Sequence, residues 1–246
     1  MTRAVLIHCA LSSARQWRGM LSYLPGWEAA QVELPGHGAA PDWDGVTDYG
    51  DAATRAAARV LGDGADVLVG HSFGAVVALR LALERPGAVA RLVLIEPVFF
   101  AAAAGTDAGA RNTADSAPYV AAMAAGDRVA AARVFLGMWG EGAGFDALSP
   151  AQQRDMTDRI HLIAAGAPLL HQDRAGLLAE RRLERLALPV LLIAGGNSHA
   201  VIDAIQGRLA ARLPQAVRVT VAGAGHMLPV THAEAVAAAI AGWRVV

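Results

Sequence analysis

The sequence of 246 residues contains a single cysteine, Cys9, so no disulfide bond can form within one chain. No cluster of cysteine and histidine has the spacing of a zinc site. Long hydrophobic runs are also missing. The most apolar stretch, residues 92–104, is interrupted by Glu96 and Pro97, whereas a membrane-spanning helix needs about 18 or more apolar residues. We therefore expect a soluble protein without a metal ion or a membrane partner.

Charge of either sign is scarce. Only 17% of the residues are charged, the formal net charge is −1, and no run of lysine and arginine marks a surface for nucleic acid. The apolar run at residues 4–7 is too short for a signal peptide and fits a strand better. These absences predict a cytoplasmic protein with no nucleic-acid partner.

Apolar residues are abundant, at 54%, which permits a large buried core. The length fits one α/β domain, since single domains of this class reach about 200–250 residues. Short β-rich runs alternate with alanine-rich helical stretches, and several of the runs are apolar throughout, as strands buried on both faces should be. This order predicts an α/β fold, a mostly parallel sheet with helices on both faces. The predicted strands are residues 4–7, 30–34, 66–69, 92–95, 190–194 and 217–221.

The stretch 99–185 breaks this alternation, because it holds helical pieces joined by glycines and no convincing strand. It follows one core strand and precedes the next, which would place it above the carboxyl ends of the strands, where ligands bind in open α/β sheets. We expect a core of residues 1–98 and 186–246 with a helical lid of residues 99–185. The alternative is a helical subdomain that only stabilises the core.

One motif indicates catalysis. The G-x-S-x-G pattern at residues 70–74 follows the predicted strand 66–69 and opens a predicted helix at 75–84. In this strand–turn–helix context the serine sits on a sharp, strained turn, and glycines on both sides relieve the crowding there. The turn also directs the amide of Phe73 at the place where an oxyanion forms. We expect Ser72 to be a nucleophile.

A serine hydroxyl needs a base to take its proton. Among the eight histidines, His226 has the best position, just after the predicted strand 217–221 and before the final helix. His171 falls within the insertion, and His71 and His199 are expected in loops. His226 is therefore the predicted base.

The elbow motif and the Gly-Ala-Gly-His-Met segment around the base resemble the α/β-hydrolase fold superfamily, and the resemblance covers nearly the whole chain. The chain starts without the first strands of longer members. Leu-Ile-His at 6–8 and Leu-Pro-Gly-His-Gly at 34–38 are further similarities, although Cys9 stands where members usually have glycine. Cys9 has no adjacent base, so we interpret it as a small buried residue rather than a second nucleophile. The resemblance implies a serine hydrolase without a cofactor, with an oxyanion hole formed by the amides of Phe73 and Ala10.

The acid that orients the base has two candidates. The usual family position follows the strand 190–194, but the loop there reads Gly-Gly-Asn-Ser-His. The next carboxylate is Asp203, inside a predicted helix at 199–213, where the helix dipole explains an acidic residue. Glu96 ends the predicted strand 92–95, and some members of the superfamily carry their acid after that strand. A charge in so apolar a sequence needs a partner. We favour Glu96, with Asp203 as the alternative.

The expected reaction is hydrolysis of a small, largely apolar carboxylic ester through an acyl-enzyme, and the expected partner is this small-molecule substrate. Serine instead of aspartate at the elbow argues against dehalogenase and epoxide hydrolase chemistry. A carbon–carbon bond hydrolase, an acyltransferase and a ligand-binding member without turnover are the alternatives. We expect an apolar pocket with Phe99, Phe100 and Trp139 in its wall.

Overall fold

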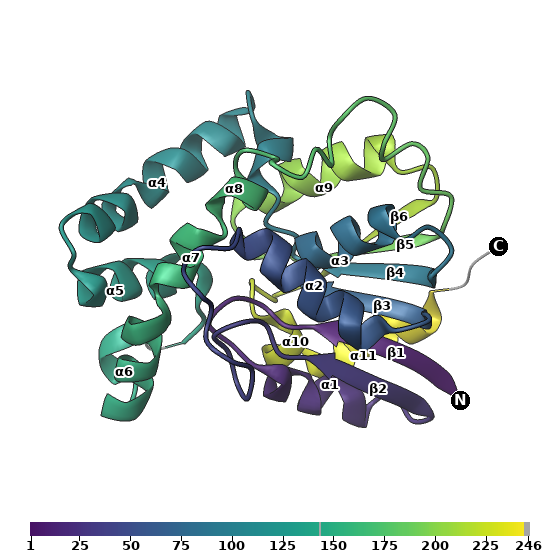
Figure 1. Cartoon of the computed structure of the whole chain (residues 1–246), viewed down its shortest axis with the longest axis horizontal. Helices are drawn as coiled ribbons and strands as arrows, with labels where there is room; N and C mark the ends of the chain where they lie inside the picture. The colour runs from purple at the N-terminus through teal and green to yellow at the C-terminus, as the bar shows by residue number, and fades with distance from the viewer. Residues whose placement is uncertain (143, 244–246) are drawn as a thin grey trace.

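The computed structural model describes residues 1–142 and 144–243, and its centre is one sheet of six parallel strands (Figure 1). The order across the sheet is β2-β1-β3-β4-β5-β6, so the direction of winding reverses between β1 and β3. In sheets of this kind ligands bind at that point, beyond the carboxyl ends of the strands. The strands are β1 (Thr2–Ile7), β2 (Trp27–Val32), β3 (Ala65–His71), β4 (Val89–Ile95), β5 (Val190–Gly195) and β6 (Ala216–Val221).

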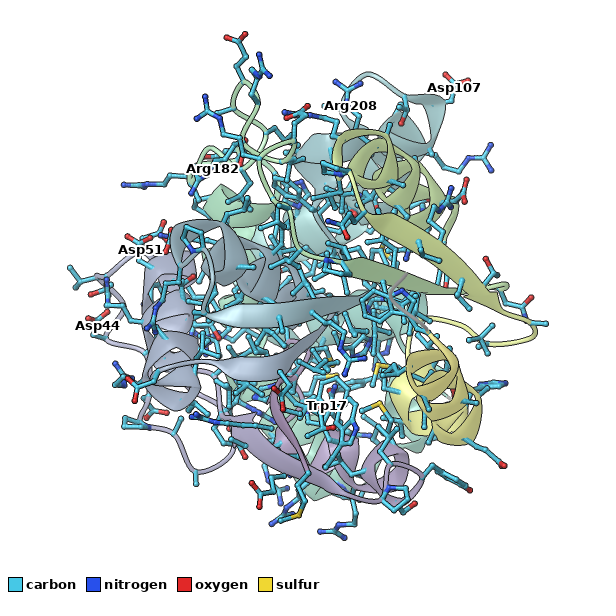
Figure 2. All side chains as sticks on the ribbon, turned by 90° about the vertical axis from the view of Figure 1, so that its right-hand side faces the viewer. Trp17, Asp44, Asp51, Asp107, Arg182 and Arg208 are labelled. Carbon is cyan, nitrogen blue, oxygen red and sulfur yellow. The ribbon has the colours of Figure 1, made fainter. Side chains whose placement is uncertain are left out.

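The inner strands are buried on both faces. In β1, Val5 and Ile7 belong to one core cluster, while Ala4 and Leu6 belong to the other, as the alternation of side chains along a strand requires. Figure 2 shows the result, with Trp17 in the interior and the labelled aspartates and arginines at the edges. The first cluster includes residues of α2 (Tyr49–Leu61), α3 (Phe73–Glu84) and α9 (Ala200–Arg212); the second includes residues of α1 (Arg18–Ser22), α10 (Leu228–Thr231) and α11 (Ala233–Gly242).

The predicted fold class is confirmed. All six predicted strands are present with ends that differ by a few residues, and the helices predicted at 75–84 and 199–213 correspond to α3 and α9. The sheet is parallel throughout, since each neighbouring pair runs in the same direction. Fully apolar strands and crossover helices therefore carried enough information to define the architecture.

The connection between β4 and β5 contains several helices up to Leu170, then turns and irregular chain up to β5, and no strand among its described residues. Figure 1 shows its helices beyond the carboxyl ends of the strands, over the edge at which β3 and β4 end. They are α4 (Asp107–Ala124), α5 (Arg128–Trp139), α6 (Pro150–Arg159), α7 (His161–Ala165) and α8 (Ala167–Leu170), with the 3-10 helices η2 (Phe100–Ala103) and η3 (Phe145–Ala147). We refer to residues 99–185 as the cap. Across the described residues, no helix combines the length and apolar character that a bilayer crossing requires.

Candidate active site

The turn between β3 and α3 has the strained geometry that its sequence predicts. Ser72 is the N-cap of α3 with φ of 57°, in the left-handed region that residues other than glycine seldom adopt. A Cβ atom built on Gly70 would lie 2.3 Å from the carbonyl oxygen of Gly74, and one on Gly74 would lie 2.3 Å from that of Ile7. Both positions therefore require glycine for β1, β3 and α3 to approach so closely.

Three side chains from separate elements are linked by hydrogen bonds at this edge of the sheet. Ser72 Oγ lies 3.0 Å from His226 Nε2, and His226 Nδ1 lies 3.0 Å from Glu96 Oε2. A carboxylate only accepts, so Nδ1 carries the ring proton and Nε2 accepts from the serine hydroxyl. Ser72 and His226 retain 7% and 8% exposure, whereas Glu96 has none. The series has the form that activates serine nucleophiles, and the hydroxyl stands at its accessible end.

Glu96 is held by the loop in which other members of the superfamily carry their acid. Its Oε1 accepts from the backbone N–H of Gly195 and from the hydroxyl of Ser198, both at 2.7 Å. Its own backbone has φ of 51°, and its N–H donates to the Ile193 carbonyl at 2.8 Å. Each carboxylate oxygen thus has a donor, as a fully buried charge requires.

Asp203, the alternative acid, lies elsewhere. It is in the first turn of α9, and its carboxylate pairs with Arg218 of β6. Its side chain is 82% exposed. The structure brings Glu96 together with His226 and leaves Asp203 on the surface.

His71, which the sequence placed in a loop, is the last residue of β3 and pairs with Ile95 of β4. That expectation was wrong, because the strand continues to the residue before the elbow. His71 Nε2 donates to the backbone carbonyl of His226 at 2.8 Å. The pKa of His71 is held well below its ordinary value, first by burial and second by the neighbouring His226. This imidazole is therefore neutral.

A buried chain of polar groups continues from His71 to the loop after β1. Gln16 Nε2 lies 3.3 Å from His71 Nδ1, and Gln16 Oε1 accepts from both the N–H and the thiol of Cys9 at 3.2 Å. Burial raises the pKa of the Cys9 thiol to about 12, so the thiol remains protonated. Sequence reasoning missed Gln16, since nothing in its local pattern indicates contact with residues 55 positions away.

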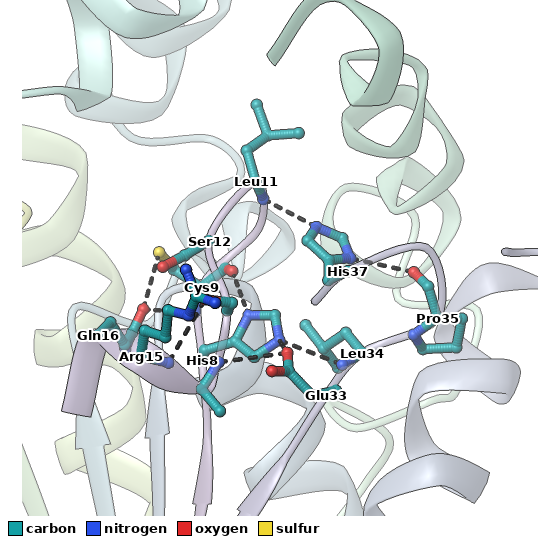
Figure 3. A network of polar contacts seen from close by, with 12 residues as sticks. His8, Cys9, Leu11, Ser12, Arg15, Gln16, Glu33, Leu34, Pro35 and His37 are labelled. Atoms are coloured by element: carbon teal, nitrogen blue, oxygen red, sulfur yellow. Dashed lines mark hydrogen bonds and ion pairs between the residues drawn. The ribbon is translucent and has the colours of Figure 1, made fainter. Parts of the chain in front are cut away.

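The loop after β1 is fixed by histidines, as Figure 3 shows. Its left-handed residue is Leu11, with φ of 59°, and the Leu11 N–H donates to His37 Nε2 at 2.9 Å. The pKa of His37 is lowered to about 3, first by burial and second by its electrostatic interaction with His8, so its Nε2 is free to accept. Cys9 is not among the described residues with positive φ. A side chain can therefore stand where members of the superfamily usually have glycine.

Two residues whose amides have no acceptor among the described residues line the same space as the serine. Phe73 is the first residue of α3, so its N–H has no intrahelical acceptor. The N–H of Ala10 makes no hydrogen bond to the described part of the chain. Ala10 and Phe73 line one cavity together with Ser72 and His226.

This cavity has a volume of about 390 Å³ and lies between the elbow and the cap. Phe100 and Trp139 line it as predicted, but Phe99 does not. Phe99, the residue before η2, is completely buried and packs into the first core cluster, so its ring belongs to the core instead of the cavity wall. The remaining wall is mainly apolar and consists of Val98, Thr113, Ser116, Tyr119, Val120, Phe135, Met138, Leu162, Ile163, Ala164, Ala167, Leu170 and His171.

The cap contacts the loops that carry these polar groups. The ring of Trp139 packs edge-on against His226 with centroids 4.9 Å apart. Glu141 accepts from the N–H of Met227 at 3.1 Å, and Arg159 donates to the carbonyl of Ser12 at 3.4 Å. No group of three or more metal-ligating side chains occurs in the ranges that the structure describes.

A serine on a strand–turn–helix elbow, hydrogen-bonded to a histidine and a buried carboxylate on a parallel sheet, defines a class of protein with the α/β-hydrolase architecture. The comparison with known families leads to the same class: the model of the alpha/beta hydrolase family matches residues 4–239, and the chain belongs to this family.

Relatives and solved structures agree with this membership. The chain is similar to lipase LipV of Mycobacterium tuberculosis, at 42% identity over 98 residues, which are 39% of this chain and 37% of LipV. It is 31% identical over 87 residues to a putative 2-succinyl-6-hydroxy-2,4-cyclohexadiene-1-carboxylate synthase of Haemophilus influenzae, covering 34% of this chain and 35% of the synthase. The matches therefore span little more than a third of these curated relatives. A hydrolase structure from Pseudomonas aeruginosa superposes with a TM-score of 0.74 at 23% identity, over 98% of this chain and 89% of that one.

Proposed function

We propose that the protein is a serine esterase that hydrolyses small, largely apolar carboxylic esters, with Ser72 as nucleophile, His226 as base and Glu96 as acid. The observation that carries the proposal is the unbroken hydrogen-bonded series from Ser72 to Glu96 at the wall of an apolar cavity. The family membership and the similarity to a lipase support the same class of reaction.

The cycle begins when the Ser72 hydroxyl attacks the ester carbonyl and His226 Nε2 takes its proton. The tetrahedral intermediate collapses, its bond to the alcohol oxygen breaks, and the imidazolium protonates the leaving alcohol. Water then attacks the acyl-serine, gives one proton to His226 and releases the carboxylic acid, while Ser72 recovers its proton. Glu96 keeps the Nδ1 proton in place and stabilises the imidazolium without being protonated.

The negative charge of both tetrahedral intermediates needs donors that are already in place. In the proposed mechanism these are the amides of Phe73 and Ala10. The Phe73 amide stands at the start of α3, where the helix dipole favours negative charge. The backbone on either side of Ala10 is held by Gln16, through Cys9, and by His37, through Leu11.

In the same proposal, the cap of residues 99–185 acts as the lid. Its aromatic and aliphatic side chains supply most of the cavity wall, so the cap would remove water from the reacting ester and bind its apolar group. A cavity of about 390 Å³ lies within the ordinary range for small-molecule sites, about 300–1,000 Å³.

The first test is the intact mass of the protein after treatment with a fluorophosphonate, which labels activated serines. We expect one adduct on the wild type and none on Ser72→Ala. Ser116→Ala is the matched control, since Ser116 lines the same cavity and its hydroxyl has no histidine partner among the described residues. An adduct that survives in Ser72→Ala would contradict the assignment of the nucleophile.

The alternatives differ in their products. A carbon–carbon bond hydrolase would leave simple esters intact and cleave a ketone, and an acyltransferase would pass the acyl group to an added alcohol or amine in preference to water. A ligand-binding member would bind esters without hydrolysing them and would form no adduct with the fluorophosphonate. Release of the free acid and alcohol from short esters, measured by chromatography, supports the esterase over all three.

A further inference from the structure

A second cavity, of about 420 Å³, lies next to the first. The two cavities have three lining residues in common, Phe100, Thr113 and His171. The rings of Phe100 and His171 stack with centroids 4.5 Å apart and planes 29° apart. This stacked pair therefore stands between two spaces of similar size, and only one of them contains Ser72 and His226.

The pair joins two helices of the cap, η2 and α8. Phe100 begins η2, four residues after Glu96, and His171 is the C-cap of α8. Phe100 also packs against Trp139, whose ring contacts His226. A chain of aromatic contacts thus leads from the proposed base to the partition between the cavities.

The two cavities differ in character. The first is lined by aromatic and aliphatic side chains, whereas the second is lined by small and polar residues from η2 and the start of α4, among them Thr106, Asp107 and Asn112. An apolar chain in the first cavity gains free energy with every methylene it buries. To grow further it must displace the stacked rings and enter a more polar space, which offers less gain.

We propose that the stacked rings of Phe100 and His171 set the longest unbranched chain that the enzyme accepts, by closing the first cavity against the second. This inference rests on the proposed esterase function. His171 keeps contact with solvent, and partial desolvation of its ring lowers its pKa, so the ring carries little charge at neutral pH beside an apolar chain.

The wild type should gain about fourfold in kcat/KM for each added methylene, which is about 0.8 kcal/mol converted at about 1.4 kcal/mol per factor of ten, and then stop gaining at the partition. Phe100→Ala and His171→Ala each remove one half of the pair and join the cavities. In both variants we expect the gain to continue into longer chains, with an increase of at least about tenfold for chains beyond the wild-type limit.

The experiment compares kcat/KM over esters from acetate to dodecanoate and over acetates of alcohols from methanol to dodecanol, because either end of the ester could face the partition. Val201→Ala is the matched control: Val201 lines the second cavity alone, so its truncation enlarges that space without opening the pair. Extension of either series in Phe100→Ala and His171→Ala, with Val201→Ala unchanged, supports the proposal. An unchanged limit in both series and both variants, with unfolding midpoints near the wild type, overturns it.

A binding measurement separates this inference from the proposed function. In a Ser72→Ala background, calorimetry with straight-chain methyl ketones reports which lengths bind, without any turnover. If no ester is hydrolysed by the wild type but Phe100→Ala lengthens the ketones that bind, the esterase proposal fails and the partition stands. If esters are hydrolysed and Phe100→Ala binds the same ketones as before, the partition fails alone.

Discussion

At the scale of single residues, Glu96 and Asp203 occupy opposite environments, and replacing each carboxylate by its amide should have unequal effects. Glu96→Gln removes the negative charge beside His226 Nδ1 and favours the wrong ring tautomer. We expect kcat to fall by several orders of magnitude, on the order of 10⁴ for such an exchange. Asp203→Asn should stay near the wild type, since it alters an exposed ion pair with Arg218.

Steady-state kinetics on a short ester measures both variants, and circular dichroism confirms that each is folded. The reverse ranking, with Asp203→Asn inactive and Glu96→Gln active, would make Asp203 the acid.

Ser198 is the residue whose contribution follows most directly from the geometry of Glu96. Ser198→Ala removes a hydrogen bond to a buried carboxylate, an interaction of about 1.5–3 kcal/mol, and leaves Glu96 Oε1 with the Gly195 amide alone. We expect kcat to fall about tenfold with KM nearly unchanged, because the serine orients the acid and does not line the cavity.

Ser198→Thr keeps a hydroxyl at the same position and is the matched control, in which activity should largely return. A rise in KM with kcat unchanged, or no recovery with threonine, would show that Ser198 acts through packing instead of through Glu96.

At the scale of elements, the elbow depends on the absence of a side chain at Gly74. Gly74→Ala would place Cβ 2.3 Å and 2.4 Å from the carbonyl oxygens of Ile7 and His8, which forces β1 and α3 apart. We expect destabilisation of about 3 kcal/mol or more, or failure to accumulate as folded protein.

Gly137→Ala is the comparison, because Gly137 lies within α5 and a Cβ there meets nothing within 4 Å. Alanine is the better helix former by about 1 kcal/mol, so this variant should be as stable as the wild type or more so. Chemical unfolding of both proteins gives the two values, and equal stability of the two variants would contradict the account of the elbow.

The elements and the elbow were predictable because local patterns define them. Apolar strands and the glycines of the motif at 70–74 report on their own surroundings. Contacts made across the fold were harder to predict: Gln16 with His71, and Ser198 with Glu96, join residues 55 and 102 positions apart. Phe99 was predicted in the cavity wall but lies in the core. The local sequence does not tell whether an aromatic residue at the start of the cap faces the core or the cavity.

At the scale of the whole molecule, buried neutral histidines make stability depend on pH. The pKa of His37 is lowered to about 3 and that of His71 is held well below its ordinary value, mainly by burial. The unfolded chain takes up these protons near pH 6.5, so it binds more protons than the folded chain below that pH. Their contribution to stability is complete above about pH 6.5 and is lost as pH falls toward the folded pKa values. The loss is up to about 1.4 kcal/mol per pH unit for each histidine.

Urea unfolding at a series of pH values between about 6.5 and 5.5, above the ordinary pKa values of aspartate and glutamate, measures this slope. His37→Gln supplies an uncharged acceptor for the Leu11 amide and should reduce the slope by about one proton. An identical slope in His37→Gln would mean that His37 is not the group that titrates.

The position of Glu96 also decides which part of the chain could be exchanged for the cap of another family member. Within a few residues the backbone leaves β4 after Ile95, supplies the Glu96 carboxylate and enters the cap at Phe99. An exchange of whole caps would have to leave Glu96 in place, because its carboxylate holds His226 Nδ1, so Val98 is a suitable amino-terminal junction. At the other end, the exchange can extend as far as Pro189, just before β5. A chimera in which the residues between Val98 and Pro189 come from another member would keep the whole hydrogen-bonded series of Ser72, His226 and Glu96. Only the part of the cavity wall that the cap supplies would change.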